Sequence, residues 1–197
     1  MGRNGEGNCE LLKRRAVFLD RDGTLNRGVV IAGRPFPPQT LSALEILPGV
    51  EHALARLRRA GFLNIVVTNQ PDVGAGRQER DVVEAINNYL CAKLAIDDMW
   101  TCYEPDSDTN KNYKPKPGML LEAAEKHGID LSCSFMIGDR WRDIGAGKAA
   151  GCYTFFIDYG YREAQPYTPD ATVDSVAEAA AVILANTPML ITLESTQ

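Results

Sequence analysis

The most informative stretch of the chain is residues 15–25, RAVFLDRDGTL. Its first five residues form an almost wholly apolar run, which is typical of a strand covered on both faces of a parallel sheet. Asp20 and Asp22 follow this run, and an i, i+2 pair that leaves a strand can project to the same side. Gly23 would let the chain turn away sharply. An Asp-Gly pair alone predicts only a turn, but the full Asp-x-Asp-Gly-Thr pattern at a strand end favours an acidic functional site.

Four further apolar runs alternate with segments of helical periodicity. This alternation predicts an α/β fold, with a doubly wound, Rossmann-like sheet of mainly parallel strands in a single core domain. The other predicted strands are Leu63–Thr68, Met99–Tyr103, Ser134–Ile137 and Tyr153–Ile157. Helices are predicted between Pro48 and Gly61 and over Gln78–Leu94, Pro117–His127, Asp143–Ala150 and Val173–Leu184. We expect the domain to span residues 14–186, between an N-terminal tail at 1–13 and a C-terminal tail at 187–197.

The composition is ordinary for a globular protein, since 45% of the 197 residues are hydrophobic and 24% are charged. The net charge of −5 gives no general attraction for nucleic acid or for an anionic membrane, so neither is an expected partner. No apolar run approaches the roughly 20 residues of a membrane span, and the N-terminus lacks a secretory pattern. The five cysteines contain no CxxC pair, which favours reduced thiols and a cytoplasmic location. Nothing in the sequence indicates an oligomeric state.

Polar residues follow three more of the predicted strands. The second strand runs into residues 68–70, Thr-Asn-Gln, whose side chains could bind phosphate oxygens or simply form a turn. Lys114 lies in a proline-restricted loop that could hold its charge in place, although a solvated basic loop is an equal alternative. Asp139 ends a strand, and Asp143 follows one helical turn later on the same face. These carboxylates could form part of a functional site, or they could simply stabilise the N-terminus of a helix through its dipole. Ligands bind at the carboxyl ends of strands in such sheets, so we expect these segments to meet there.

The four segments, in this order and each at a strand end, resemble the four sequence motifs of the haloacid dehalogenase (HAD) superfamily. The resemblance spans roughly residues 15–184, which is nearly all of the predicted domain. More narrowly, residues 20–26 (DRDGTLN), 67–70 (VTNQ) and 114–119 (KPKPGM) are similar to the group of histidinol phosphatases and heptose bisphosphate phosphatases. The resemblance therefore implies a phosphoric monoester hydrolase.

The resemblance assigns catalytic roles to four residues. Asp20 would attack the phosphorus atom and form an aspartyl-phosphate, a known form of covalent catalysis by carboxylates. Asp22 would protonate the leaving alcohol and then activate the water that hydrolyses the intermediate. Thr68 and Lys114 would bind the transferring phosphoryl group, and the lysine would balance its charge.

The same resemblance implies a Mg²⁺ site. Asp20, the backbone carbonyl of Asp22 and Asp139 would hold the ion, which suits an oxygen-rich set of ligands. Asp143 would orient Lys114 or a metal-bound water. Mg²⁺ is therefore the cofactor that the sequence predicts.

Members of this group often carry a small zinc site, built from three Cys and one His, before the motif lysine. At the corresponding positions this chain has Cys102, Glu104, Asn110 and Asn112. One thiol with a carboxylate and two amides is a poor zinc site, so we expect no structural zinc. The loop before the lysine would then be held by other contacts or be mobile.

Two further departures concern the substrate. The group usually has Arg directly before the motif lysine, where this chain has Tyr113, and Ala-Arg-Gly after the second motif, where this chain has Gly-Ala-Gly and then Arg77. Arginine binds phosphate in a bidentate manner, so both changes weaken the prediction of a bisphosphate substrate but not that of catalysis. The candidate substrate-binding residues are Asn69, Gln70, Arg77, Arg27 and Tyr113.

A large cap domain over the site is not expected, because residues 25–47 and 71–113 are short and already contain core elements. The favoured function is Mg²⁺-dependent hydrolysis of a small phosphorylated sugar or polyol, with heptose (bis)phosphate first and histidinol phosphate as the alternative. A nucleic-acid 3′-phosphatase is less favoured, because the acidic chain lacks a basic stripe. A phosphate-binding protein without turnover would lack some of Asp20, Asp22, Lys114 and Asp139, which are all present. Transfer of the phosphoryl group to an acceptor other than water stays open.

Overall fold

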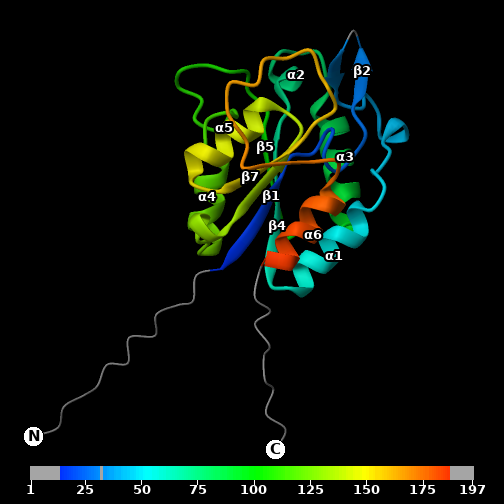
Figure 1. The fold of residues 1–197 in the computed structure, drawn as a ribbon. Coiled ribbons are helices and arrows are strands. Elements are labelled where there is room, and N and C mark those ends of the chain that lie inside the picture. Colours follow the sequence, from blue (N-terminus) through cyan, green and yellow to red (C-terminus); the bar gives the residue numbers. More distant parts are fainter. Residues whose placement is uncertain (1–13, 32, 187–197) are drawn as a thin grey trace, which may run out of the picture.

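The central feature of the computed structural model, which describes residues 14–31 and 33–186, is a sheet of six parallel strands. Their order is β5-β4-β1-β6-β7-β8, so that β1 lies inside the sheet between β4 and β6 (Figure 1). The strands are β1 Arg15–Leu19, β4 Phe62–Asn69, β5 Asp98–Cys102, β6 Phe135–Gly138, β7 Tyr153–Ile157 and β8 Ala171–Val173. The predicted α/β class is confirmed. The predicted tails, 1–13 and 187–197, lie outside the described residues.

Helices cover both faces of this sheet (Figure 1). They are α1 Val50–Arg59, α2 Pro71–Gly74, α3 Arg80–Lys93, α4 Gly118–His127, α5 Trp141–Ala150 and α6 Val176–Asn186. Successive side chains of β1 point to opposite faces. Val17 and Leu19 belong to a core with α1, α3 and α6, whereas Ala16 and Phe18 belong to a core with α4 and α5. Both faces are therefore buried, which explains the nearly continuous apolar sequence of the strands.

Several helix boundaries differ from the sequence prediction, and for two helix starts the structure shows the cause. α5 begins at Trp141, two residues before the predicted start, because the Asp143 carboxylate accepts a hydrogen bond of 2.9 Å from the backbone N–H of Arg140 and caps the first turn. α6 begins at Val176, three residues later than predicted, because Ala171–Val173 forms β8 beside β7. A three-residue edge strand is too short to show a periodicity in the sequence.

The segment between β1 and α1 holds a small hairpin, formed by β2 Val29–Ile31 and β3 Arg34–Phe36, and then the 3-10 helix η1 Leu41–Ala43. Proline is tolerated in β3 because a two-stranded ribbon leaves one edge of each strand unpaired. Between β4 and Lys114 the chain contains only α2, α3 and β5 as regular elements, so neither segment forms a large cap. Within the described ranges, no helix combines the length and the apolar character that a membrane span requires.

Candidate active site

The four sequence segments meet at the carboxyl edge of the sheet. β1 leads directly into Asp20, β4 carries Thr68 near its end, and β6 is followed directly by Asp139. Because β4, β1 and β6 are neighbours, these residues lie at adjacent strand ends. Lys114 reaches the same place from the loop after β5. The shared edge therefore explains why residues far apart in the sequence form one site.

A cavity of about 240 Å³ opens over this edge. Asp20 and Thr68 line it from the sheet edge, Lys114 lines it from the loop after β5, and residues 35–37, at the end of the hairpin, also line it. Tyr113 also lines the cavity, where we predicted a contact with substrate. The remaining lining residues are Asp22, Asn69, Gln70, Pro71, Asp72, Arg140 and Arg142. A small hairpin, rather than a cap domain, therefore bounds part of the site.

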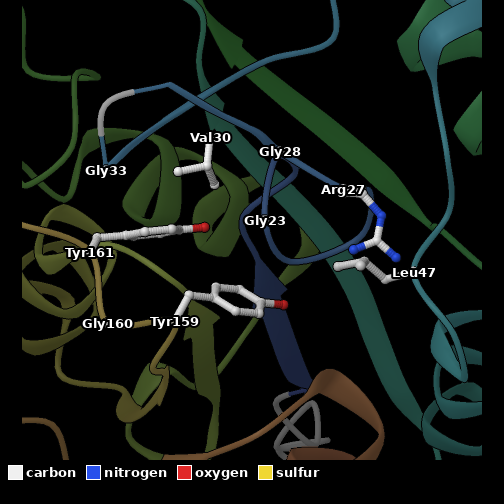
Figure 2. Close-up of a pocket in the computed structure, with 9 residues that line it drawn as sticks. All are labelled: Gly23, Arg27, Gly28, Val30, Gly33, Leu47, Tyr159, Gly160 and Tyr161. Atoms are coloured by element: carbon white, nitrogen blue, oxygen red, sulfur yellow. The ribbon is translucent and has the colours of Figure 1, made fainter.

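Two of the predicted substrate-binding residues do not line this cavity. The guanidinium of Arg27 contacts Glu45 at 2.8 Å, and Arg27 lines a second cavity, of about 270 Å³, that two tyrosines also line (Figure 2). Arg77 donates to Asp72 from Nε at 2.9 Å, and most of its side chain is exposed. In both cases a carboxylate pairs with the guanidinium, and for Arg77 that carboxylate, Asp72, itself lines the cavity. The contact of Arg27 and Arg77 with substrate therefore stays a prediction.

Lys114 is the centre of the ionic contacts. Its buried ammonium donates to Asp20 Oδ1 at 2.7 Å, to Asp143 Oδ1 at 2.6 Å and to the carbonyl of Val67 at 2.7 Å. Burial lowers the pKa of Lys114, but Asp143 and Asp20 outweigh burial and hold the pKa above its ordinary value. Asn69 fixes the backbone of Lys114, since its amide donates to the lysine carbonyl and accepts from the lysine N–H, both at 3.1 Å. Asn69 thus holds the backbone of the lysine loop, and its contact with substrate stays a prediction.

Three carboxylates of the site are buried close together. Oxygen atoms of Asp20, Asp139 and Asp143 lie within 4.8 Å of one another. Burial raises the pKa of Asp20 to about 6, although Lys114 offsets part of the rise. Burial also raises the pKa of Asp139 well above its ordinary value, and the charges of Asp20 and Asp143 add to this rise. A bound cation would relieve such repulsion.

Asp139 shows most clearly that the site fits a metal ion. Both of its carboxylate oxygens are buried, and no described residue completes a hydrogen bond of good geometry to either one. The hydroxyl of Tyr161 lies close enough to offset part of the rise in the Asp139 pKa. An ionised, buried carboxylate is costly without a partner. A hard divalent cation held by Asp20 and Asp139 would supply that partner, so the residues present fit Mg²⁺.

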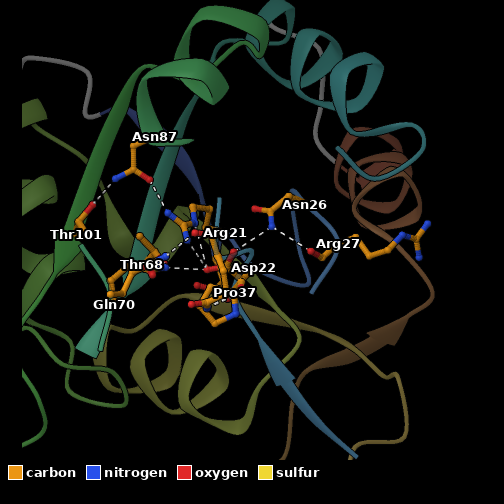
Figure 3. Close-up of polar contacts among 12 residues, drawn as sticks. Arg21, Asp22, Asn26, Arg27, Pro37, Thr68, Gln70, Asn87 and Thr101 are labelled. Carbon is orange, nitrogen blue, oxygen red and sulfur yellow. Dashed lines mark hydrogen bonds and ion pairs between the residues drawn. The ribbon is translucent and has the colours of Figure 1, made fainter. Parts of the chain in front are cut away.

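The carboxylate of Asp22 is held by three side chains (Figure 3). Arg21 donates to Asp22 Oδ2 from Nε at 3.1 Å and from Nη2 at 2.8 Å, and Gln70 donates to the same oxygen at 2.7 Å. Asn26 donates to the other oxygen at 3.0 Å. Gln70 also donates to Thr68 Oγ1 at 2.9 Å. The amide nitrogen of Gln70, which we predicted to contact substrate, is therefore already engaged between Asp22 and Thr68.

Arg21 and Asn87 also belong to this network, although the sequence does not single them out as functional residues. Arg21 is completely buried, and its Nη1 donates to Asn87 Oδ1 at 2.8 Å. Asn87 in turn donates to Thr101 at 3.1 Å (Figure 3). The position of Arg21, between two aspartates at the end of a buried strand, could have indicated such a network, because a buried charge needs buried partners. Asn87 gives no such signal, since polar residues on helices are mostly exposed.

The loop that precedes the motif lysine is held by hydrogen bonds. Asn110 Nδ2 donates to the carbonyl of Glu104 at 3.2 Å and lies 3.4 Å from Sγ of Cys102. Asn112 donates to a carboxylate oxygen of Glu122 at 3.3 Å. The thiol and the two amides are thus engaged within the loop and its surroundings, and this set of donors does not suit zinc. Of the two predicted alternatives, the structure shows a loop held by other contacts.

Comparisons with known proteins agree with this geometry. A family model described as HAD-hydrolase-like matches residues 112–179. The D-glycero-D-manno-heptose-1,7-bisphosphate 7-phosphatase of Thermosynechococcus vestitus is 34% identical over 166 residues, which are 76% of this chain and 82% of that protein. The chain belongs to the HAD phosphatases. This HAD phosphatase is also 31% identical to the corresponding enzyme of Escherichia coli K12 over 170 residues, which are 79% of this chain and 83% of that protein.

A solved structure shares the fold of this HAD phosphatase. It is the D,D-heptose 1,7-bisphosphate phosphatase from B. bronchiseptica, complexed with magnesium and phosphate, with a TM-score of 0.72. The match covers 88% of this chain and 99% of that one at 24% sequence identity. The likeness confirms the HAD core fold, including the parallel sheet whose carboxyl edge forms the site.

Proposed function

We propose that this HAD phosphatase hydrolyses a phosphate ester of a small phosphorylated sugar, with D-glycero-D-manno-heptose 1,7-bisphosphate as the first candidate. The observation that carries the proposal is the contact of one buried lysine, Lys114, with both Asp20 and Asp143 beside the cavity. This contact joins a carboxylate nucleophile to a cation that can neutralise a phosphoryl group. Relatives that match over most of the chain are named for this substrate. Histidinol phosphate is the alternative substrate.

In the proposed reaction, a carboxylate oxygen of Asp20 bonds to phosphorus as the bond to the ester oxygen breaks. The leaving alcohol takes its proton from Asp22, and the phosphoryl group stays on Asp20. Asp22 then takes a proton from a water molecule, which attacks the aspartyl-phosphate and releases inorganic phosphate. Lys114 and Thr68 bind the phosphoryl oxygens, and Asp143 keeps the lysine in place through its contact at 2.6 Å.

We also propose that Asp20, Asp139 and the backbone carbonyl of Asp22 hold Mg²⁺. The ion would supply positive charge that screens the repulsion between the phosphate and the nucleophile. Two observations support this assignment, namely the unpartnered oxygens of Asp139 and the raised pKa of Asp20. Without a cation, a pKa of about 6 would leave part of Asp20 protonated in mildly acidic solution.

A small metabolite fits the charge of the protein better than a nucleic acid does. The net charge is −5, so there is no general attraction for a polyanion. We place the reaction in the cytoplasm, because Cys91, Cys102, Cys133 and Cys152 are all free thiols.

The test is the release of inorganic phosphate from heptose 1,7-bisphosphate, heptose 7-phosphate, histidinol phosphate and a 3′-phosphorylated oligonucleotide, each with Mg²⁺ or with EDTA. We expect Mg²⁺-dependent release that is fastest from the bisphosphate and absent in Asp20→Asn. Asp81→Asn is the matched control, because Asp81 is exposed on α3 and does not line the cavity. A folded protein that releases phosphate from none of these compounds would refute the proposal. Faster release from histidinol phosphate than from the bisphosphate would make histidinol phosphate the substrate.

A further inference from the structure

Arg142 is a cation of the cavity that the proposed chemistry leaves unused. It is the second residue of α5 and lines the cavity together with Asp20 and Lys114. Its guanidinium carbon lies 4.4 Å from the ring centroid of Trp141 and 6.0 Å from that of Tyr113. Contacts between a cation and aromatic rings restrict the orientation of the guanidinium. Two aromatic rings therefore limit the orientation of the Arg142 guanidinium beside the cavity.

The other two cations that line the cavity already have carboxylate partners. Lys114 contacts Asp20 at 2.7 Å, and Nε of Arg140 donates to Glu163 at 2.6 Å. Arg142, in contrast, forms no ion pair with a carboxylate in residues 14–31 or 33–186, and its buried Nε has no hydrogen-bond partner there. A buried donor without a partner costs free energy. The described part of the chain therefore supplies neither a counter-charge for this guanidinium nor an acceptor for its Nε.

We propose that Arg142 binds a second anionic group of the substrate, namely a phosphate remote from the ester that is hydrolysed. A planar guanidinium presents parallel N–H donors that match the oxygens of a phosphate. Arg142 lines the same cavity as Asp20 and Lys114, but its side chain forms no hydrogen bond or ion pair with either of them in the described ranges. The inference rests on the proposed function and extends it, because it makes the enzyme selective for a bisphosphate over the matching monophosphate.

The test compares kcat and KM of the wild type and Arg142→Gln on heptose 1,7-bisphosphate, heptose 7-phosphate and p-nitrophenyl phosphate. We expect the variant to lose about 10- to 100-fold in kcat/KM on the bisphosphate, mainly through KM, because a charge-assisted hydrogen-bonded contact is lost. Activity on the two monoesters should change little. Arg142→Lys keeps the charge but not the paired donors, so its kcat/KM on the bisphosphate should lie between those of the wild type and Arg142→Gln.

Arg59→Gln is the matched control, because Arg59 is exposed and ends α1 just before β4 begins, at the opposite edge of the sheet. An unchanged ratio of bisphosphate to monophosphate kcat/KM in Arg142→Gln would overturn the inference and leave the proposed function intact. A wild type that is inactive on all three compounds would overturn the proposed function together with the inference. Thermal unfolding of each variant checks the fold, and if Arg142→Gln does not fold, the same ratio measured in Arg142→Lys gives the answer.

Discussion

A Cβ atom on Gly23 would lie 1.9 Å from Oδ2 of Asp139, a distance at which two atoms that are not bonded to each other overlap. Gly23 also has a φ of +88°, in the left-handed region that side chains rarely adopt. The lack of a side chain at Gly23 is therefore what lets Asp139 approach the turn that follows β1. Glycine at this position serves the candidate metal site as well as the turn.

Gly23→Ala should displace Asp139 and weaken Mg²⁺ binding by about 10-fold or more, as changes around metal ligands do. The matched control is Gly61→Ala, because Gly61 has a φ of +86° but nothing within 4 Å of its added Cβ. Backbone strain should cost both variants about 1–2 kcal/mol of unfolding free energy. Only Gly23→Ala should lose affinity in a calorimetric Mg²⁺ titration, and equal affinities in the two variants would contradict the assignment of Asp139.

The raised pKa of Asp20 fixes the sign of a pH effect on stability. In the metal-free protein this pKa is about 6, against an ordinary value of 3.8, so the folded state holds the proton more tightly than the unfolded chain does. Stability should therefore fall as pH rises through that interval. Asp20→Asn removes this loss and should be more stable than the wild type at pH 7 in EDTA, by about 1–3 kcal/mol.

Urea unfolding at pH 4 and at pH 7 measures this difference. The gap between Asp20→Asn and the wild type should shrink at pH 4, where Asp20 is protonated, and also at pH 7 when Mg²⁺ is added. A wild type that is the more stable protein at pH 7 in EDTA would show that Lys114 outweighs the burial of Asp20.

The two hydrogen bonds between Asn69 and the backbone of Lys114 predict a positioning effect. Asn69→Ala removes both and should lower kcat by about 10-fold, with a loss of about 1–3 kcal/mol in unfolding free energy. Asn69→Asp keeps the acceptor for the lysine N–H but not the donor, so it should have an intermediate kcat. If kcat is unchanged in Asn69→Ala, the loop holds Lys114 without this contact.

Arg21 should matter for turnover more than for substrate binding, because it contacts Asp22 and Asn87 within the protein. Arg21→Met should lower kcat by about 10- to 100-fold with a smaller change in KM, since Asp22 loses a partner that fixes its position. Arg15→Met is the control, because Arg15 begins β1, at the end of the strand away from Arg21, and its guanidinium lies over Phe62. Equal kcat in the two variants would argue against a role for Arg21.

The core of the fold could be predicted because its strands are buried on both faces. β1 Arg15–Leu19 and β7 Tyr153–Ile157 have the predicted bounds, since a continuous apolar run marks each of them. β8 Ala171–Val173 could not be predicted, because a three-residue strand at a sheet edge is specified by pairing with β7 rather than by its own sequence. The hairpin was not predicted either, because its two three-residue strands are specified by pairing with each other rather than by a sequence period.

Part of the candidate site could also be predicted from the sequence, and part could not. The meeting of Asp20 with Lys114 could be predicted, because Asp20 follows one strand directly, Lys114 lies in the loop after another, and the parallel sheet brings the carboxyl ends of its strands together. The contacts of Arg21 with Asn87 and of Arg27 with Glu45 could not be predicted, because they join separate segments of the chain. Arg21 reaches Asn87, which lies 66 residues away in the sequence, and Arg27 is held by Glu45 rather than facing the cavity.

The proposed reaction requires a phosphorylated Asp20, and trapping this aspartyl-phosphate is the most direct test of it. The wild-type protein would be mixed with Mg²⁺ and the best substrate, quenched in acid, reduced with borohydride and digested for mass spectrometry. Reduction converts an aspartyl-phosphate to homoserine, so we predict homoserine at position 20 in the wild type and no such product in Asp20→Asn. Turnover that proceeds with no modification at residue 20, or with modification at another carboxylate, would contradict the account.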